Sequence, residues 1–124
     1  MLQKGGTSIA VSKDIVIVFK SNGLGNTELA PLREKLAKTY LTLVQQMQPI
    51  PAAICFYTEG VRLACEGSPV LEELAILENK GVHLVLCQTC LNTFGLEEKV
   101  KVGTIGGMGD IISAMWQADT VITV

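Results

Sequence analysis

The sequence contains no apolar run long enough to cross a membrane, and only 5% of its residues are aromatic. Its strongest apolar runs, Ile15 to Phe19 and Val82 to Cys87, have the length of a β-strand and fall far short of the roughly 20 residues that span a bilayer. Residues 1–12 contain two glycines and lack the apolar stretch of a secretory signal. We therefore expect no membrane partner and a cytoplasmic location.

Neither sign of charge is in excess, because ten lysine and arginine residues are balanced by twelve aspartate and glutamate residues. No basic cluster is interleaved with aromatic side chains, which is the pattern that nucleic-acid binding proteins show. The sequence therefore predicts no nucleic-acid partner.

Proline is missing after residue 69, and histidine occurs once, as His83. A thioredoxin-like fold carries a cis-proline after its CxxC motif, so the absence of proline downstream of Cys87 argues against that fold. No second close cysteine pair completes a four-ligand zinc site, since Cys55 lies inside an apolar run and Cys65 stands alone. We expect neither a metal nor an organic cofactor, and we interpret His83 as a structural residue.

With 124 residues, 48% of them hydrophobic, the chain can build one core. We expect a flexible N-terminal segment, 1–13, and a single α/β domain, 14–124. Strand-like runs alternate with helix-like periodicity through short loops, which predicts a three-layer sandwich: a mainly parallel sheet of about five strands with helices on both faces. The predicted strands are 14–19, 52–57, 82–86, 100–103 and 120–124. The predicted helices are 28–48, 69–79, a short one that starts within 87–90 and ends near 94–95, and 110–117.

Apolar residues at helical spacing predict which side of each helix faces the core. For the first helix this stripe is Leu29, Leu32, Leu36, Tyr40, Leu43 and Met47, with a subunit contact as the alternative use. For the last helix the predicted buried residues are Ile111, Ile112, Met115 and Trp116. Two glycine-containing segments, 21–27 and 106–109, are interpreted as turns, with Asp110 capping the last helix.

Cys87 and Cys90 form the most informative motif, a CxxC directly after a buried strand and at the predicted start of a helix. Sites in parallel sheets gather at the carboxyl ends of the strands. A helix start favours a thiolate, so Cys87 is predicted to be an exposed nucleophile that attacks a sulfur donor and holds the transferred atom as a persulfide. Cys90 is predicted to be an auxiliary thiol that resolves this intermediate by forming a disulfide.

Two other readings of the pair stay open. Free cysteine is among the most buried residue types, so both thiols could be structural in a non-catalytic ligand-binding or assembly module. The same spacing also suits a dithiol redox protein that cycles between a Cys87–Cys90 disulfide and two thiols.

Four segments together resemble the DsrE/F-like family, most closely the C-terminal domain of YedF-type proteins, which are described as sulfurtransferase-like proteins of selenium metabolism. The resemblance extends over residues 14–124 and is carried by 56–61 (FYTEGV), 66–74 (EGSPVLEEL), 87–92 (CQTCLN) and 118–123 (ADTVIT).

The resemblance implies a parallel-sheet α/β fold, assembly into a homo-oligomer, and a sulfur or selenium relay through a cysteine persulfide or perselenide. In the sulfur-relay branch the active cysteine follows the third strand, a position that corresponds to Cys87. YedF-type proteins usually carry an additional TusA-like domain, so the resemblance implies a separate TusA-like sulfur carrier or a cysteine desulfurase as a partner.

Overall fold

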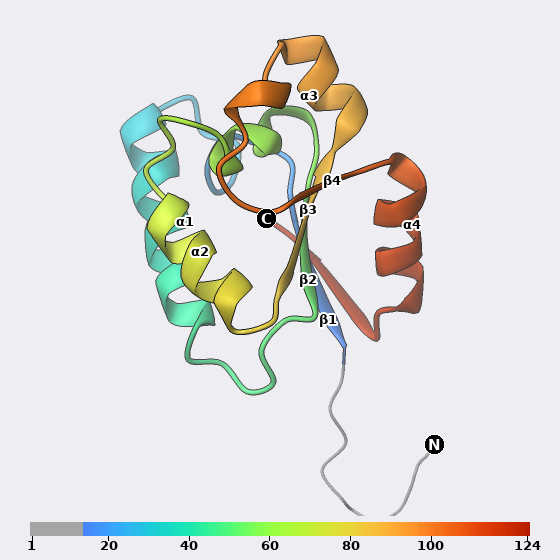
Figure 1. Ribbon diagram of the computed structural model, residues 1–124. Helices are drawn as coiled ribbons and strands as arrows, with labels where there is room; N and C mark the ends of the chain where they lie inside the picture. Colours follow the sequence, from blue (N-terminus) through green and yellow to red (C-terminus); the bar gives the residue numbers. More distant parts are fainter. Residues whose placement is uncertain (1–13) are drawn as a thin grey trace, which may run out of the picture.

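The computed structural model describes residues 14–124, so the predicted flexible segment 1–13 lies outside the described part of the chain. Five strands and four α-helices alternate along the chain (Figure 1), joined in two places by short 3-10 helices. The elements are β1 (Ile15–Phe19), α1 (Ala30–Val44), β2 (Ala53–Phe56), η1 (Thr58–Ala64), α2 (Leu71–Asn79), β3 (His83–Cys87), α3 (Gln88–Phe94), η2 (Glu97–Lys99), β4 (Thr104–Gly106), α4 (Met108–Gln117) and β5 (Thr120–Thr123).

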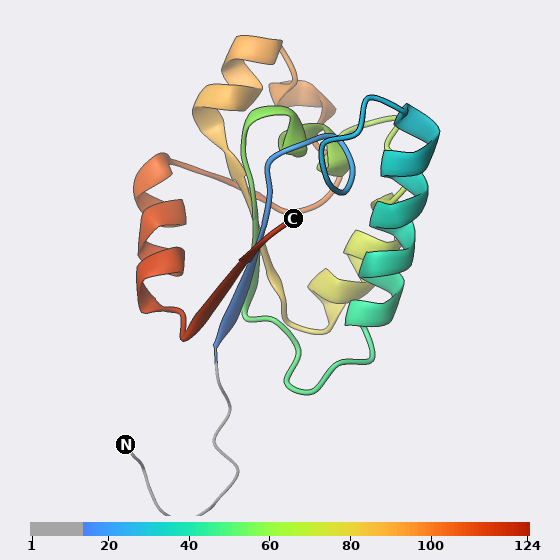
Figure 2. The ribbon, with the colours of Figure 1, turned by 180° about the vertical axis from the view of Figure 1, so that it is seen from behind.

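All four strand pairs of the sheet are parallel, and the strand order is β4-β3-β2-β1-β5. The chain therefore moves from β1 toward β4 and then returns across the sheet to β5. Right-handed crossovers place the helices of the outward path on one face and the return helix on the other. Figures 1 and 2 show this arrangement, with α1 and α2 on one face, α4 on the opposite face and α3 above the carboxyl edge of β3. The predicted three-layer α/β fold is thereby confirmed.

The core of this fold lies between the sheet and its helices and is mainly aliphatic, with two phenylalanines at its centre. Phe19 of β1 stacks on Phe56 of β2 with ring centroids 5.8 Å apart, and Tyr40 of α1 meets Phe19 edge-on at 6.2 Å. Both phenylalanines are fully buried. Because parallel strands must be buried on both faces, these aromatic contacts tie the centre of the sheet to α1.

The predicted buried stripe of the first helix is wrong. The residues of α1 that are buried are Ala37, Leu41 and Val44, whereas most of the stripe points outward. The exposed members are Leu29, Leu32, Leu36, Leu43 and Met47. α1 carries apolar residues on more than one side, so periodicity alone selected the richer stripe rather than the one that contacts the sheet.

The predicted core face of the last helix is wrong for two of its four residues. Ile111 is fully buried and Met115 packs partly against the core, but Ile112 is exposed and Trp116 is 86% exposed. Since residues four apart share one side of a helix, Met108, Ile112 and Trp116 form a continuous apolar stripe on the outer side of α4.

Two element boundaries also differ from prediction. The fourth strand is β4, Thr104–Gly106, rather than 100–103, because Gly103 turns the chain with a φ of 87° before pairing with β3 begins. The second helix starts at Leu71, since the Ser68 hydroxyl accepts a hydrogen bond from the Val70 amide at 3.1 Å in a turn that precedes the helix. Asp110 does cap α4, because its carboxylate accepts the Gly107 amide at 2.9 Å.

Candidate thiol site

The carboxyl ends of β1, β2 and β3 meet at one edge of the sheet, and Cys87 lies there as the last residue of β3. It pairs with Gly106 of β4 and immediately precedes α3. Its side chain is only 1% exposed and makes no hydrogen bond that caps the helix. The predicted position of Cys87 is correct, but the predicted exposure of its thiol is wrong. Strand pairing holds the backbone of Cys87 in the sheet, where neighbouring elements cover its sulfur.

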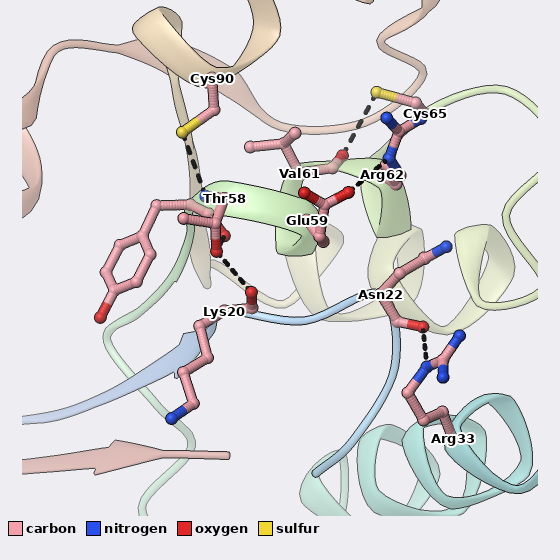
Figure 3. A network of polar contacts seen from close by, with 10 residues as sticks. Lys20, Asn22, Arg33, Thr58, Glu59, Val61, Arg62, Cys65 and Cys90 are labelled. Carbon is pink, nitrogen blue, oxygen red and sulfur yellow. Dashed lines mark hydrogen bonds and ion pairs between the residues drawn. The ribbon is translucent and has the colours of Figure 1, made fainter. Parts of the chain in front are cut away.

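Cys90 is the partly exposed thiol of the pair, one turn into α3. Its sulfur accepts a hydrogen bond from the backbone amide of Thr58 at 3.1 Å (Figure 3). Thr58 follows β2, which is the neighbour of β3 in the sheet, so the register of these two strands brings the amide beneath α3. The amide donor that the sequence led us to expect at Cys87 is therefore found at Cys90, and it comes from the first residue of η1.

Thr58 is held in an unusual backbone conformation. Its φ of 48° is the one positive value among the non-glycine residues from 14 to 124. Its hydroxyl donates to the carbonyl of Lys20, which follows β1, or to the adjacent carbonyl of Tyr57 at 2.7 Å. A β-branched residue rarely adopts this conformation, which costs about 1–3 kcal/mol of backbone strain. The hydroxyl contacts offset this strain, and the resulting conformation directs the Thr58 amide toward Cys90.

The charges beside the pair come from η1. Arg62 donates through Nε to Glu59 at 3.1 Å, and its guanidinium stacks on the Phe94 ring of α3 at 4.5 Å. Burial raises the pKa of Cys90 above its usual value. A hydrogen bond with Cys87 and the charges of Cys87 and Glu59 raise this pKa further, while the Thr58 amide opposes them. Cys90 is therefore a protonated thiol at neutral pH.

The two remaining cysteines lie away from this pair and are buried. Cys55 lies in the middle of β2, and burial raises the pKa of its thiol to about 11. Cys65 follows η1, and its thiol donates a hydrogen bond to the carbonyl of Val61 at 3.3 Å. Burial raises the pKa of the Cys65 thiol, although the nearby Arg62 charge lowers it. Neither is placed to react with a substrate at neutral pH.

A polar cleft of about 430 Å³ opens on the other side of Glu59, between η1 and the loop after β1. Arg33 organises that loop by donating to the carbonyl of Asn22 at 3.3 Å (Figure 3) and to the carbonyl of Thr27 at 2.7 Å. The segment 21–27 is thus a turn fastened to α1, as predicted. His83 begins β3 at the opposite, amino end of the sheet, away from the thiols, and its side chain is exposed.

Sequence reasoning missed Thr58 and Arg62 as neighbours of the thiols, and it placed Glu59 at the same sheet edge without assigning it to the site. The segment 56–61 marks the family resemblance, but it does not indicate a contact with a CxxC motif about 30 positions later. The signal that could have found them is the sheet order, because adjacent parallel strands end side by side and Thr58 comes two residues after β2.

Within residues 14–124 no group of cysteine, histidine, aspartate and glutamate has the geometry of a metal site. None of the helices described is both long and apolar enough to cross a bilayer.

The fold and site together define a parallel α/β domain with a dithiol at the carboxyl edge of its third strand. The sequence pattern of the DsrE/DsrF-like family matches residues 13–124, and the chain belongs to that family. No curated protein matches the chain.

Solved structures share the fold at low sequence identity. The YchN protein from E. coli has a TM-score of 0.68 and 20% identity, over 90% of this chain and 99% of that one. MTH1491 from Methanobacterium thermoautotrophicum, described as a protein of unknown function, has a TM-score of 0.64 and 16% identity over the same shares. BT1422 from Bacteroides thetaiotaomicron, also described as being of unknown function, has a TM-score of 0.61 and 14% identity, over 90% and 95%.

Proposed function

We propose that the chain is a sulfurtransferase-like carrier that relays sulfur or selenium as a persulfide or perselenide on the Cys87–Cys90 pair. The observation that carries this proposal is the placement of the two free thiols at the carboxyl edge of the sheet, with the Thr58 amide donating to Cys90 at 3.1 Å. Family membership is consistent with it. No other described cysteine combines partial exposure with an amide donor.

The chemistry needs only thiols. A thiolate of the pair attacks the outer sulfur of a donor persulfide, the sulfur–sulfur bond of the donor breaks, and the donor leaves as a thiol after taking up a proton. The second thiol, three residues away in the sequence, then governs whether the bound atom is passed on or released. Backbone amide donors stabilise such sulfur anions without any cofactor.

Intact-mass spectrometry after incubation with glutathione persulfide tests the carrier function. We expect wild type to gain the mass of one sulfur atom and the double variant Cys87→Ser/Cys90→Ser to gain none. The double variant is its own control for nonspecific loading, since Cys55 and Cys65 remain. An adduct of equal yield on the double variant, or none on wild type, would refute the relay.

A reversible dithiol is the second candidate, and the spacing of two free thiols at the start of α3 favours it. In that case glutathione redox buffers produce a Cys87–Cys90 disulfide within their accessible range, and persulfide donors give no sulfur-loaded protein even at the earliest times. Both states are distinguished in the same mass spectrum, because the disulfide is two hydrogens lighter than wild type.

We propose that the carrier works as a homo-oligomer. The outer stripe of α4 and the exposed leucines of α1 leave apolar side chains on two opposite faces of a small domain, and large exposed apolar areas mark association surfaces. A charge on either stripe is expected to weaken association by at least about tenfold. Light scattering should show Trp116→Glu dissociating at concentrations where wild type and the exposed polar control Gln117→Glu stay assembled. A wild type that is monomeric at every concentration would contradict the proposal.

Within the family, the segments 66–74 and 87–92 support a relationship to the C-terminal domain of YedF-type proteins and thus a role in selenium metabolism. The proposed partners are a TusA-like sulfur carrier or a cysteine desulfurase. A cytoplasmic setting fits this chemistry, because the four cysteines are free thiols.

A further inference from the structure

The two thiols of the pair differ in access and in hydrogen bonding, and this difference separates their roles. Building on the proposed sulfur relay, we propose that Cys90 accepts the incoming sulfur atom, that the Thr58 backbone amide positions it, and that Cys87 reacts second. This order is the reverse of the one that the sequence predicts.

Access decides which thiol can react first. Displacement at sulfur requires the attacking thiolate to approach along the line of the breaking sulfur–sulfur bond, so the donor must reach the protein sulfur from solvent. Cys87 is 1% exposed and its backbone is paired with β4, whereas Cys90 is partly exposed on α3. A bulky donor therefore reaches Cys90 without any rearrangement of the sheet.

The Thr58 amide supplies what a reacting Cys90 needs. It donates to the sulfur at 3.1 Å, and its direction is fixed by the hydroxyl contacts of Thr58 with the backbone after β1 (Figure 3). A backbone donor stabilises the thiolate before attack and the persulfide anion after it. Because the amide belongs to η1, which follows β2, and the thiol to α3, which follows β3, this contact exists only in the folded sheet.

The steps balance without an external oxidant. Cys90 loses its proton to solvent and attacks the outer sulfur of a donor persulfide. The donor's sulfur–sulfur bond breaks, its thiolate takes up a proton, and Cys90 becomes the persulfide. Cys87 then attacks the Cys90 sulfur, releasing hydrosulfide and forming a Cys87–Cys90 disulfide. A small thiol such as glutathione reduces that disulfide through a mixed disulfide, and a second glutathione completes the reduction.

Peptide-level mass spectrometry of single variants, quenched at early times after mixing with glutathione persulfide, tests the order. Cys90→Ser is expected to lose loading by more than about tenfold, which is a difference above 1.4 kcal/mol in the barrier. Cys87→Ser is expected to load at Cys90 and to retain the persulfide longer than wild type, because the resolving thiol is absent. Cys90→Ala and circular-dichroism melting check that loss of loading is not loss of folding.

The outcomes separate this inference from the proposed function. Loading of Cys90→Ser but not of Cys87→Ser, or equal loading of both, overturns the assigned order while the relay survives. Absence of any adduct on wild type overturns the relay itself.

The positioning role of Thr58 has its own readout. In ¹⁵N-¹H spectra of wild type, the Thr58 amide shift is expected to follow the ionisation of Cys90 with pH, and this response is expected to vanish in Cys90→Ser. Thr58→Gly keeps the amide and tolerates the positive φ but loses the hydroxyl anchor, so it should load more slowly than wild type. A Thr58 amide that ignores Cys90 ionisation would overturn the positioning role.

Discussion

Replacing Gly60 by alanine is expected to destabilise the protein by about 3 kcal/mol and to lower its Tm by about 10 °C. Gly60 lies in η1 directly against the end of β1, where an added Cβ would stand 2.1 Å from the carbonyl oxygen of Phe19 and 2.7 Å from its carbonyl carbon. Both atoms belong to the backbone of a buried strand, so neither can swing aside. The strand and the 3-10 helix must separate, and the segment that carries Thr58 must move with them.

Gly109 provides the matched control for this substitution. It lies inside α4, and an added Cβ there meets nothing within 4 Å. Alanine at this position is therefore expected to stabilise the protein by about 0.5–1 kcal/mol through helix propensity. Urea denaturation of both variants measures the two effects. A Gly60→Ala variant within about 1 kcal/mol of wild type would show that η1 does not pack as closely on β1 as described.

Removing Cys87 is expected to make Cys90 more reactive toward iodoacetamide at neutral pH, by severalfold. Burial is the largest cause of the raised pKa of Cys90, and next comes the hydrogen bond with Cys87, which favours the protonated thiol. Cys87→Ala removes that bond and the neighbouring sulfur charge, so the pKa of Cys90 falls and a larger thiolate fraction is present at pH 7. In wild type, alkylation should instead be slow at neutral pH and rise steeply in the alkaline range.

Glu59→Gln is expected to increase the alkylation rate of Cys90 by a smaller amount, because Glu59 is the weakest of the causes that raise the pKa of Cys90. Its removal also frees the Arg62 guanidinium, which favours the thiolate further. Glu66→Gln serves as control, since Glu66 is an exposed carboxylate whose charge does not influence Cys90. Alkylation with iodoacetamide, quenched at set times and followed by peptide mapping, measures the rate at Cys90 in Cys87→Ala, Glu59→Gln and Glu66→Gln. A wild type as reactive at pH 7 as an unfolded control would contradict the described surroundings of Cys90.

The parallel α/β fold could be predicted from the sequence because β1, β2 and β3 lie in short, mainly apolar runs and proline or glycine lies near the ends of the helices. The second helix shows the limit of this punctuation. Ser68 and Pro69 signal a helix start correctly to within a few residues, but a side-chain turn delays the first helical residue to Leu71. Local signals thus locate elements better than they locate the ends of elements.

There is a physical reason why the buried faces of the helices could not be predicted from the sequence. Both α1 and α4 carry apolar residues around much of their circumference, and periodicity cannot tell which side meets the sheet. In α4 the buried residue is Ile111, while Trp116, the largest apolar side chain of the helix, faces outward. If the exposed stripes contact other subunits, the apolar pattern of the sequence reflects burial within the domain and burial between subunits together. The structure of one chain reveals only the burial within the domain.

The candidate site was found by its motif but not by its surroundings. CxxC after a strand identifies Cys87 and Cys90, and the parallel sheet explains why they lie at the carboxyl edge. The exposure of each thiol depends on what covers it in three dimensions. The amide that contacts Cys90 belongs to Thr58, 32 residues earlier, and its direction depends on a positive φ that threonine seldom adopts. No local pattern encodes that contact.

Discharge of a preloaded protein tests the relay most directly. The chain is loaded with isotopically labelled sulfur from glutathione persulfide, freed of donor, and mixed with a small acceptor thiol. The account predicts that the label leaves the Cys87–Cys90 peptide and appears on the acceptor or as hydrosulfide faster than from the same protein denatured in urea. Label that remains on the protein, or leaves no faster than from the denatured chain, would contradict a carrier function for this thiol pair.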